Sequence, residues 1–119
     1  MDSYAAAKET KNKSTSVVRT FLDAVTNHDF EKARSMVADD LKFIGVKATV
    51  EGADEYFNQM KQMKLKYDIR KVFSSENDVA VFYDIKMGDE TVLAAGWYGF
   101  QGDLIKTIQV VFDSAKFGA

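Results

Sequence analysis

The C-terminal half of the chain alternates apolar and polar residues between short turns, and this pattern most narrows the possible folds. In "VAVFYDIKM" (79–87) apolar side chains occupy every second position. "GDE" and "QGD" separate this segment from "TVLAAGWYGF" (91–100) and "LIKTIQVVFD" (104–113). Such alternation is typical of half-buried strands, and three-residue turns join antiparallel neighbours. The sequence therefore predicts an antiparallel meander of three long strands, preceded by a strand in "LKYDIRKVF" (65–73).

The N-terminal half shows helical spacing instead. Ser14, Thr15 and Ser16 are suitable N-caps for a first helix, and Asp29 can cap a second that ends at "ADD". A third helix is expected from about Ala53 to Met63. Apolar stripes of helical period mark the three helices. They comprise Val17, Val18, Phe21, Leu22 and Val25; then Phe30, Ala33, Met36 and Val37; then Tyr56, Phe57, Met60 and Met63.

The order of these elements predicts an α+β domain. "LKFIGV" (41–46) indicates a strand and "KATVEG" (47–52) a short extended segment between the second and third helices. Residues 1–13 are polar and unpatterned, so we expect a flexible N-terminal tail followed by a single domain over 14–119. A length of 119 residues suits one hydrophobic core, with the helices packed on one face of a curved antiparallel sheet.

Composition excludes several function classes. The chain has no cysteine and one histidine, so neither a cysteine-based nor a multi-histidine metal site is expected. No metal or cofactor motif occurs, and we expect neither. A net charge of −2 does not favour nucleic acid. No apolar run approaches the ~20 residues of a membrane span, and the N-terminus is polar. We therefore expect a cytoplasmic protein that binds neither nucleic acid nor membrane.

The chain resembles the nuclear-transport-factor-2-like superfamily, and within it the SnoaL-like branch, which includes polyketide-cyclase-like and ketosteroid-isomerase-like proteins. The resemblance spans residues 15–113 and rests on the order and spacing of three segments. It implies a cystatin-like α+β roll, in which a cone-shaped curved antiparallel sheet wraps around three N-terminal helices and encloses a pocket. It also implies a homodimer formed through the outer face of the sheet. The three segments are "VVRTFLDAVTNHDFEKARSMVADDLKF", "EGADEYFNQM" and "GWYGFQGDLIKTIQVVFD".

The resemblance also shows which catalytic positions are vacant. The tyrosine of ketosteroid isomerases corresponds to Phe21, their carboxylate base to a position near Gly45, and their second aspartate to one near Gly96. A phenyl ring cannot donate a hydrogen bond and glycine cannot take a proton, so isomerase chemistry by this route is not expected. Dehydratases of the fold need more than one histidine, and His28 lies in the break between two helices.

Two aspartates remain as candidate catalytic residues. Cyclase-like members place a general acid/base at the end of the last strand, where Asp113 falls. Strict alternation puts Asp113 opposite Ile108, Val110 and Phe112, so it would need a bulge to face a pocket; a solvated strand exit is the alternative. Asp84 would be either a pocket carboxylate or an outer-face ion-pair partner. With Asp68 and Arg70 it could also mimic the aspartate–arginine–aspartate set of epoxide hydrolases, although the spacing fits poorly.

Aromatic and methionine side chains are the candidate ligand contacts. Trp97 and Tyr98 lie on opposite faces of one strand, so one of them is expected to face the interior. Each of these side chains could instead be ordinary core. The predicted contacts are Phe21, Phe43, Tyr56, Phe57, Met60, Trp97, Tyr98 and Phe112.

Two functions of different kinds follow. The first is a protein that binds a small hydrophobic ligand between helices and sheet, with isomerase, cyclase or lyase acid-base chemistry by Asp113 or Asp84 if it is an enzyme. The second is a non-catalytic dimeric interaction or scaffold domain. A cavity with a buried carboxylate would favour the first, and a filled core with an apolar outer sheet face the second.

Overall fold

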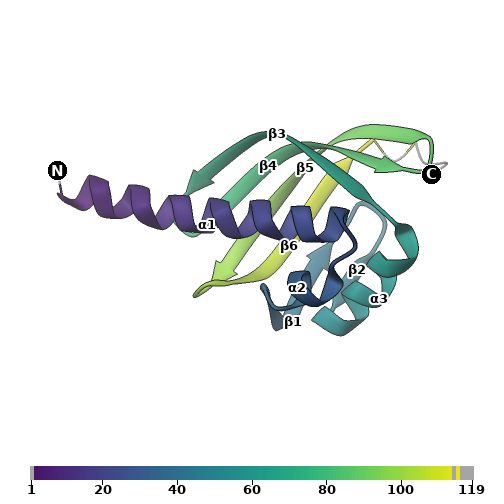
Figure 1. Ribbon diagram of the computed structural model, residues 1–119, viewed down its shortest axis with the longest axis horizontal. Coiled ribbons are helices and arrows are strands. Elements are labelled where there is room, and N and C mark those ends of the chain that lie inside the picture. Colours follow the sequence, from purple (N-terminus) through teal and green to yellow (C-terminus); the bar gives the residue numbers. More distant parts are fainter. Residues whose placement is uncertain (1, 114, 116–119) are drawn as a thin grey trace.

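Three helices lie on one side of a curved, unclosed sheet of six strands (Figure 1). The computed structural model describes residues 2–113 and 115. The predicted α+β class is confirmed. The elements are α1 (Asp2–Thr26), α2 (Phe30–Arg34), β1 (Val37–Ile44), β2 (Thr49–Glu51), α3 (Ala53–Met63), β3 (Lys66–Ser75), β4 (Asp78–Met87), β5 (Glu90–Gln101) and β6 (Leu104–Phe112).

The sheet has the order β2-β1-β6-β5-β4-β3. Strands β3 to β6 form the predicted antiparallel meander, with β3 as its first member. Its turns contain two residues rather than three, and Gly88 and Gly102 open two of them with φ of 61°, a conformation that glycine adopts without strain. One pairing differs from the expected antiparallel sheet, because β1 runs parallel to β6. The last strand is therefore in the middle of the sheet.

Helix α1 begins much earlier than the sequence suggested. The expected caps were Ser14 to Ser16, yet the helix runs without interruption from Asp2 to Thr26. Its C-terminal half packs against β3 and β4, while its N-terminal half extends beyond the sheet (Figure 1). This extension gives the molecule a longest dimension of 50 Å. None of the described helices is long and apolar enough to cross a membrane.

Two further element boundaries can be compared with the sequence. Helix α3 has the predicted bounds, and Asp29 caps α2 through a hydrogen bond from the Lys32 N–H to its Oδ1 (3.2 Å). Helix α2 is shorter than expected, because β1 starts at Val37 and includes the "ADD" segment that was expected to be a break. Val37 and Leu41 are buried in this strand, whereas Asp39 and Asp40 face solvent.

The core fills the space between α1, α3 and the inner face of the sheet. Phe21 of α1 contacts Phe57 of α3 and Tyr98 of β5 edge to face, with ring centroids 6.3 and 6.4 Å apart. Among the described residues no charged or polar side chain is fully buried, apart from the tyrosines of this core. Its largest fully buried side chains are Tyr83, Tyr98, Phe21, Leu22, Leu41, Ile105 and Ile108.

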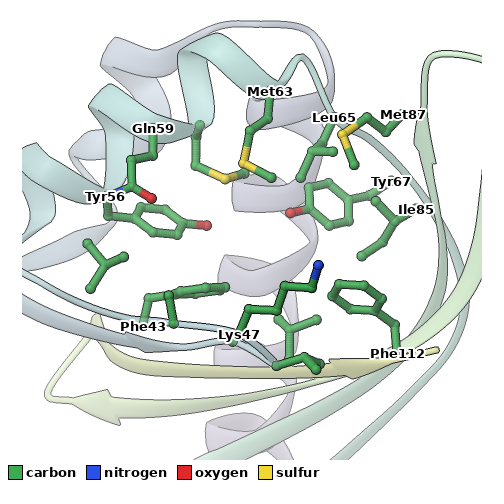
Figure 2. A pocket seen from close by; sticks show the side chains of 16 residues that line it. Phe43, Lys47, Tyr56, Gln59, Met63, Leu65, Tyr67, Ile85, Met87 and Phe112 are labelled. Carbon is green, nitrogen blue, oxygen red and sulfur yellow. The ribbon is translucent and has the colours of Figure 1, made fainter. Parts of the chain in front are cut away.

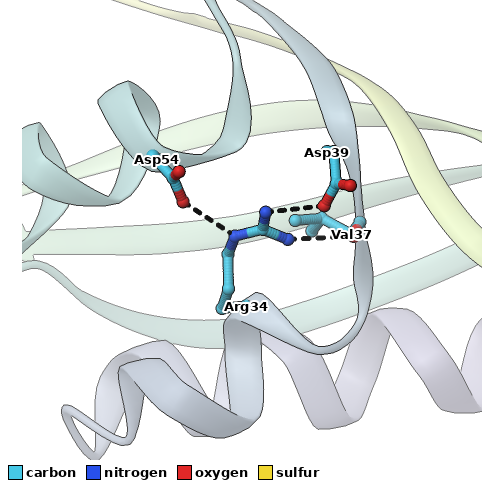
Figure 3. Close-up of polar contacts among 4 residues, drawn as sticks. All are labelled: Arg34, Val37, Asp39 and Asp54. Atoms are coloured by element: carbon cyan, nitrogen blue, oxygen red, sulfur yellow. Dashed lines mark hydrogen bonds and ion pairs between the residues drawn. The ribbon is translucent and has the colours of Figure 1, made fainter.

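Arg34 ties α3 to the rest of the domain (Figure 3). Its Nε donates to Asp54 of α3 (3.1 Å), and its Nη2 donates to Asp39 of β1 (2.7 Å). Nη1 donates to the carbonyl of Val37 at 3.5 Å. The hydrogen bonds to Asp39 and Asp54 raise the pKa of the guanidinium. The network therefore holds the first turn of α3 beside β1, and α3 supplies one wall of the site described next.

Candidate functional site

A cavity of about 230 Å³ lies between α3, the loop after β1 and the ends of the central strands. Its walls are almost entirely apolar, with Phe43, Met60 and Phe112 among the larger side chains. The cavity lies at one end of the inner face, while the other end is filled by the core. Its remaining lining residues are Gly45, Val46, Lys47, Ala48, Val50, Tyr56, Gln59, Met63, Leu65, Tyr67, Ile85, Met87 and Val110.

Two tyrosine hydroxyls face each other across this cavity. Figure 2 shows Tyr56 and Tyr67 on opposite walls, with their phenol oxygens directed toward one another. Neither hydroxyl has a hydrogen-bond partner among the described residues. Burial raises the pKa of Tyr56 and of Tyr67 far above the usual value, so both remain neutral O–H groups at physiological pH. Both can donate to a molecule in the cavity.

Packing fixes the position of each phenol. The ring of Tyr56 lies 5.3 Å from that of Phe43 and 5.1 Å from that of Phe57. The ring of Tyr67 lies 4.9 Å from that of Tyr83, and the Tyr67 backbone N–H donates to Thr26 Oγ1 at 2.9 Å. These contacts restrict both rings, so the two hydroxyls converge on one region before any ligand is present.

Lys47 is the one charged residue among the described residues that line the cavity. It comes from the loop after β1, which is closed by a hydrogen bond from the Gly45 N–H to the Ala48 carbonyl (2.8 Å). In Figure 2 its ammonium group points into the cavity, on the side of Tyr67 and Phe112. Within the described chain, no carboxylate lies at ion-pair distance from it.

The filled end of the interior contains a second pair of tyrosines. The hydroxyls of Tyr83 and Tyr98 lie 2.8 Å apart and share a buried hydrogen bond. Gly96 makes room for this pair, because a Cβ at that position would overlap the Tyr83 hydroxyl. Gly96 is near the position of the second aspartate of ketosteroid isomerases. In this chain the Tyr83 hydroxyl covers Gly96.

The predicted catalytic carboxylates lie outside the cavity. Asp113 follows β6, is exposed, and accepts a hydrogen bond from the Ala115 N–H at 3.1 Å. Asp113 is therefore a solvated residue at the exit of the strand, which was the alternative to a catalytic role. Phe112 points inward to the cavity, so the side chain of Asp113 points outward. Asp84 lies on the outer face of β4, 3.7 Å from the Nε of Arg70. Asp68, which is opposite Asp84 on β3, is exposed as well.

The predicted ligand contacts fall into three groups. Phe43, Tyr56, Met60 and Phe112 line the cavity. Phe21, Phe57 and Tyr98 lie in the core instead, because neighbouring side chains fill the space around them. Trp97 lies on the outer sheet face and is 55% exposed, so of the two adjacent aromatics it is Tyr98 that faces inward.

Sequence reasoning missed several lining residues. Leu65, Tyr67 and Ile85 belong to the alternating apolar positions in and just before β3 and in β4. That alternation could have identified them as inward-facing and therefore as candidate lining residues. Lys47 and Gln59 carried no such signal, since one lies in a loop and the other beside an exposed helix face. Only the three-dimensional arrangement brings Lys47 next to the cavity.

Comparisons with known proteins agree with this fold. The model of the SnoaL-like domain matches residues 18–108. An NTF2-like protein of unknown function from Cytophaga hutchinsonii is 31% identical, with a TM-score of 0.86, and the match covers 89% of this chain and 95% of that one. No curated protein matches the sequence.

More distant structures share the fold alone. An LEH-like epoxide hydrolase from M. tuberculosis is 18% identical, with a TM-score of 0.78 and coverage of 89% of this chain and 86% of that one. An NTF2-like protein of unknown function from Burkholderia pseudomallei is 15% identical, with a TM-score of 0.79 and coverage of 88% and 94%. The family match, which spans most of the chain, settles the assignment that the sequence resemblance suggested. The chain belongs to the SnoaL-like domain family, within the NTF2-like fold.

Proposed function

We propose that this protein binds a small, mostly apolar molecule in the cavity beside α3. The observation that carries the proposal is an apolar cavity into which two unpaired tyrosine hydroxyls project. Apolar walls favour an apolar ligand, and a few fixed polar groups orient it. A dry apolar cavity of about 150 Å³ holds benzene, so about 230 Å³ suits a compact ligand of about ten non-hydrogen atoms.

Binding without carboxylate catalysis is the form of this function that the geometry favours. A general base must lie within hydrogen-bond reach of the proton that it removes. Asp113 and Asp84 both lie outside the lining, and Asp84 is on the opposite face of the sheet. The polar groups that do reach the cavity are phenols, an amide and an ammonium. They suit recognition of a ligand oxygen better than proton abstraction.

Titration with a compact neutral ketone tests the proposal. Addition of 1-indanone should shift the ¹H–¹⁵N NMR signals of cavity residues such as Val50 and Val110 and should leave β4 residues of the outer face unchanged. Ligand binding also raises the free energy of unfolding, by about 2.7 kcal/mol at roughly 100 times Kd.

A blocked cavity provides the control. Ala48 lines the cavity from an exposed loop, so Ala48→Trp should fill the entrance while changing stability by less than about 0.5 kcal/mol. Ser75→Trp, on an exposed strand end outside the lining, is the matched variant and should bind as the wild type does. Binding that survives Ala48→Trp unchanged would place the ligand elsewhere and contradict the proposal.

A second candidate function, a dimeric interaction domain, is favoured by the outer face of the sheet. Five large apolar side chains there are 44–55% exposed, which is unusual for a monomer surface. Strand pairing makes them neighbours, since Phe82, Ala95 and Val111 form one row and the rings of Phe73 and Phe82 lie 6.1 Å apart. We call Phe73, Phe82, Leu93, Trp97 and Val111 the outer patch.

We propose a second copy of this chain as the occupant of the outer patch. Its rim carries both signs of charge, Lys71 and Lys86 as well as Asp84, so two copies can meet without like-charge contacts. Sedimentation velocity should show a dimer that Trp97→Lys dissociates. Leu104→Lys, at an exposed apolar position at the start of β6 and outside the outer patch, is the control and should leave the dimer intact. A wild-type protein that stays monomeric at about 100 μM would exclude a stable dimer through this patch.

A further inference from the structure

The polar groups of the cavity, taken together, select one charge type. Its lining within the described residues contains an ammonium and two phenol hydroxyls but no carboxylate. The amide Nε2 of Gln59 already donates to Glu55 Oε1 at 3.2 Å. The cavity therefore offers several hydrogen-bond donors and one positive charge, with no negative charge to balance them.

The donors converge rather than being scattered over the wall. Tyr56 projects from α3, Tyr67 from β3 and Lys47 from the loop after β1, and all three side chains point into the same space (Figure 2). Tyr56 is only 4% exposed as a residue, and its hydroxyl, which has no partner among the described residues, opens onto the cavity. A donor that faces an apolar cavity can form a hydrogen bond there when a ligand supplies an acceptor. Three donors around one space match the several lone pairs of a carboxylate.

We propose that the ligand of this cavity is a compact aromatic or alicyclic carboxylate, held by Lys47 and the hydroxyls of Tyr56 and Tyr67. This inference rests on the proposed function and specifies the ligand's chemical class. The apolar body of the ligand would pack against Phe43 and Phe112. Removal of a carboxylate from water is unfavourable, and three hydrogen bonds with one opposite charge offset that loss.

A pair of isosteric probes separates charge from shape. Phenylacetate and phenylacetamide have the same size, about ten non-hydrogen atoms, which fits the cavity. Isothermal titration calorimetry at low salt should give phenylacetate a Kd lower than that of the amide by about tenfold or more. Because part of this preference is electrostatic, it should shrink when salt is raised to about 0.5 M.

Variants assign the preference to residues. Lys47→Met keeps the length of the side chain and removes its charge, so it should weaken phenylacetate much more than phenylacetamide and thereby abolish the preference. Tyr56→Phe and Tyr67→Phe each remove one oxygen and should each weaken phenylacetate by about three- to tenfold. Lys86→Met, at an exposed lysine outside the lining, is the matched control and should change neither affinity.

The outcomes distinguish this inference from the proposed function. Equal affinities for the two probes, or a preference that persists in Lys47→Met, would overturn the inference and leave ligand binding itself intact. Absence of binding by phenylacetate, phenylacetamide and 1-indanone alike would overturn the proposed function, and the carboxylate inference with it. A preference for phenylacetate that is lost in Lys47→Met, together with weaker phenylacetate binding in Tyr56→Phe and Tyr67→Phe and unchanged binding in Lys86→Met, would support both.

Discussion

Two pairs of tyrosines occupy opposite ends of the same interior and differ in how their hydroxyls are satisfied. Tyr83 and Tyr98 share a hydrogen bond of 2.8 Å in the filled end. Tyr56 and Tyr67 face each other across a cavity, and neither has a partner among the described residues. Tyr83 and Tyr98 form a hydrogen bond with each other and so contribute to stability. The hydroxyls of Tyr56 and Tyr67 remain able to form hydrogen bonds with a ligand.

The difference shows how one residue type can serve folding in one place and recognition in another. Space decides which role a tyrosine takes. Gly96 lets the Tyr83 hydroxyl approach the sheet closely and closes the interior there. Beside α3 the lining side chains leave about 230 Å³ unfilled. Four perturbations test whether the two ends are as different as the structure indicates.

Alkaline pH should have the largest effect, and it should affect both pairs. Burial raises the pKa of all four tyrosines above the unfolded value of about 10. The folded protein therefore keeps protons that the unfolded chain releases, so the stability is fully present below pH 10 and falls above it. Four groups at about 1.4 kcal/mol each give a loss of up to roughly 5 kcal/mol per pH unit.

Urea unfolding at pH 8, 10 and 11, with tyrosinate absorbance recorded in parallel, measures this loss. Tyr98→Phe and Tyr67→Phe should each reduce the pH slope by about a quarter. Tyrosinate absorbance could instead rise before the protein unfolds, and this early rise could be absent in Tyr67→Phe but present in Tyr98→Phe. That result would show that the hydroxyls beside the cavity are hydrated and ionise more easily than those of Tyr83 and Tyr98.

Truncation of one phenylalanine at each end should show the next largest effect. Phe21→Ala removes a fully buried ring that contacts Phe57 and Tyr98, and should lower the free energy of unfolding by about 3–5 kcal/mol. Phe43→Ala enlarges a cavity that already exists beside a half-buried ring, so about half that loss or less is expected. Urea unfolding of both variants measures the two losses of unfolding free energy. Equal losses would mean that the cavity end is packed as tightly as the core.

A methyl group at Gly96 should disturb the filled end more specifically. Gly96→Ala places a Cβ against the Tyr83 hydroxyl and should destabilise the protein by about 1–3 kcal/mol. In a Tyr83→Phe background the same substitution should destabilise the protein less, because the hydroxyl oxygen that the added Cβ would overlap is absent. A double-mutant cycle of unfolding free energies measures this coupling. Additive effects would show that the tyrosine hydroxyl is not what requires glycine at this position.

Removal of single hydroxyls should give the smallest effects and the clearest contrast. Tyr98→Phe leaves the Tyr83 hydroxyl buried without its partner and should lower stability by about 1–2 kcal/mol. Tyr56→Phe removes a hydroxyl that has no partner, so stability should change by less than about 0.5 kcal/mol while affinity for phenylacetate falls. Urea unfolding and calorimetric titration of both variants measure the two effects. A reversed pattern would exchange the roles assigned to the two pairs.

Local sequence pattern accounts for most of the fold. Apolar alternation located β4, β5 and β6, and the stripe that follows Gly52 located α3 at Ala53–Met63. The start of α1 was missed because residues 2–13 carry no apolar stripe, although alanine, lysine and glutamate there favour a helix without one. The parallel pairing of β1 with β6 was missed because no local pattern encodes the register of strands whose paired residues, such as Lys42 and Thr107, are far apart in the sequence.

The site was only partly predictable, for a physical reason. Phe43, Tyr56, Met60 and Phe112 were expected to contact a ligand, and they do line the cavity. Phe21, which has the same apolar character, lies in the core instead. Whether an inward side chain borders empty space depends on the summed volumes of its neighbours, which periodicity does not report.

The central position of β6 has a consequence for how the sheet is assembled. Strand β6, which follows all the other described strands in the sequence, is the one that joins β1 and β2 to the rest of the meander. Without Leu104–Phe112 the chain has two separate pieces of sheet, β1 with β2 and β3 with β4 and β5, and only the second of them packs against α1. The sheet therefore becomes continuous only once β6 is in place, and removal of Leu104–Phe112 would leave two sheet fragments rather than a smaller domain.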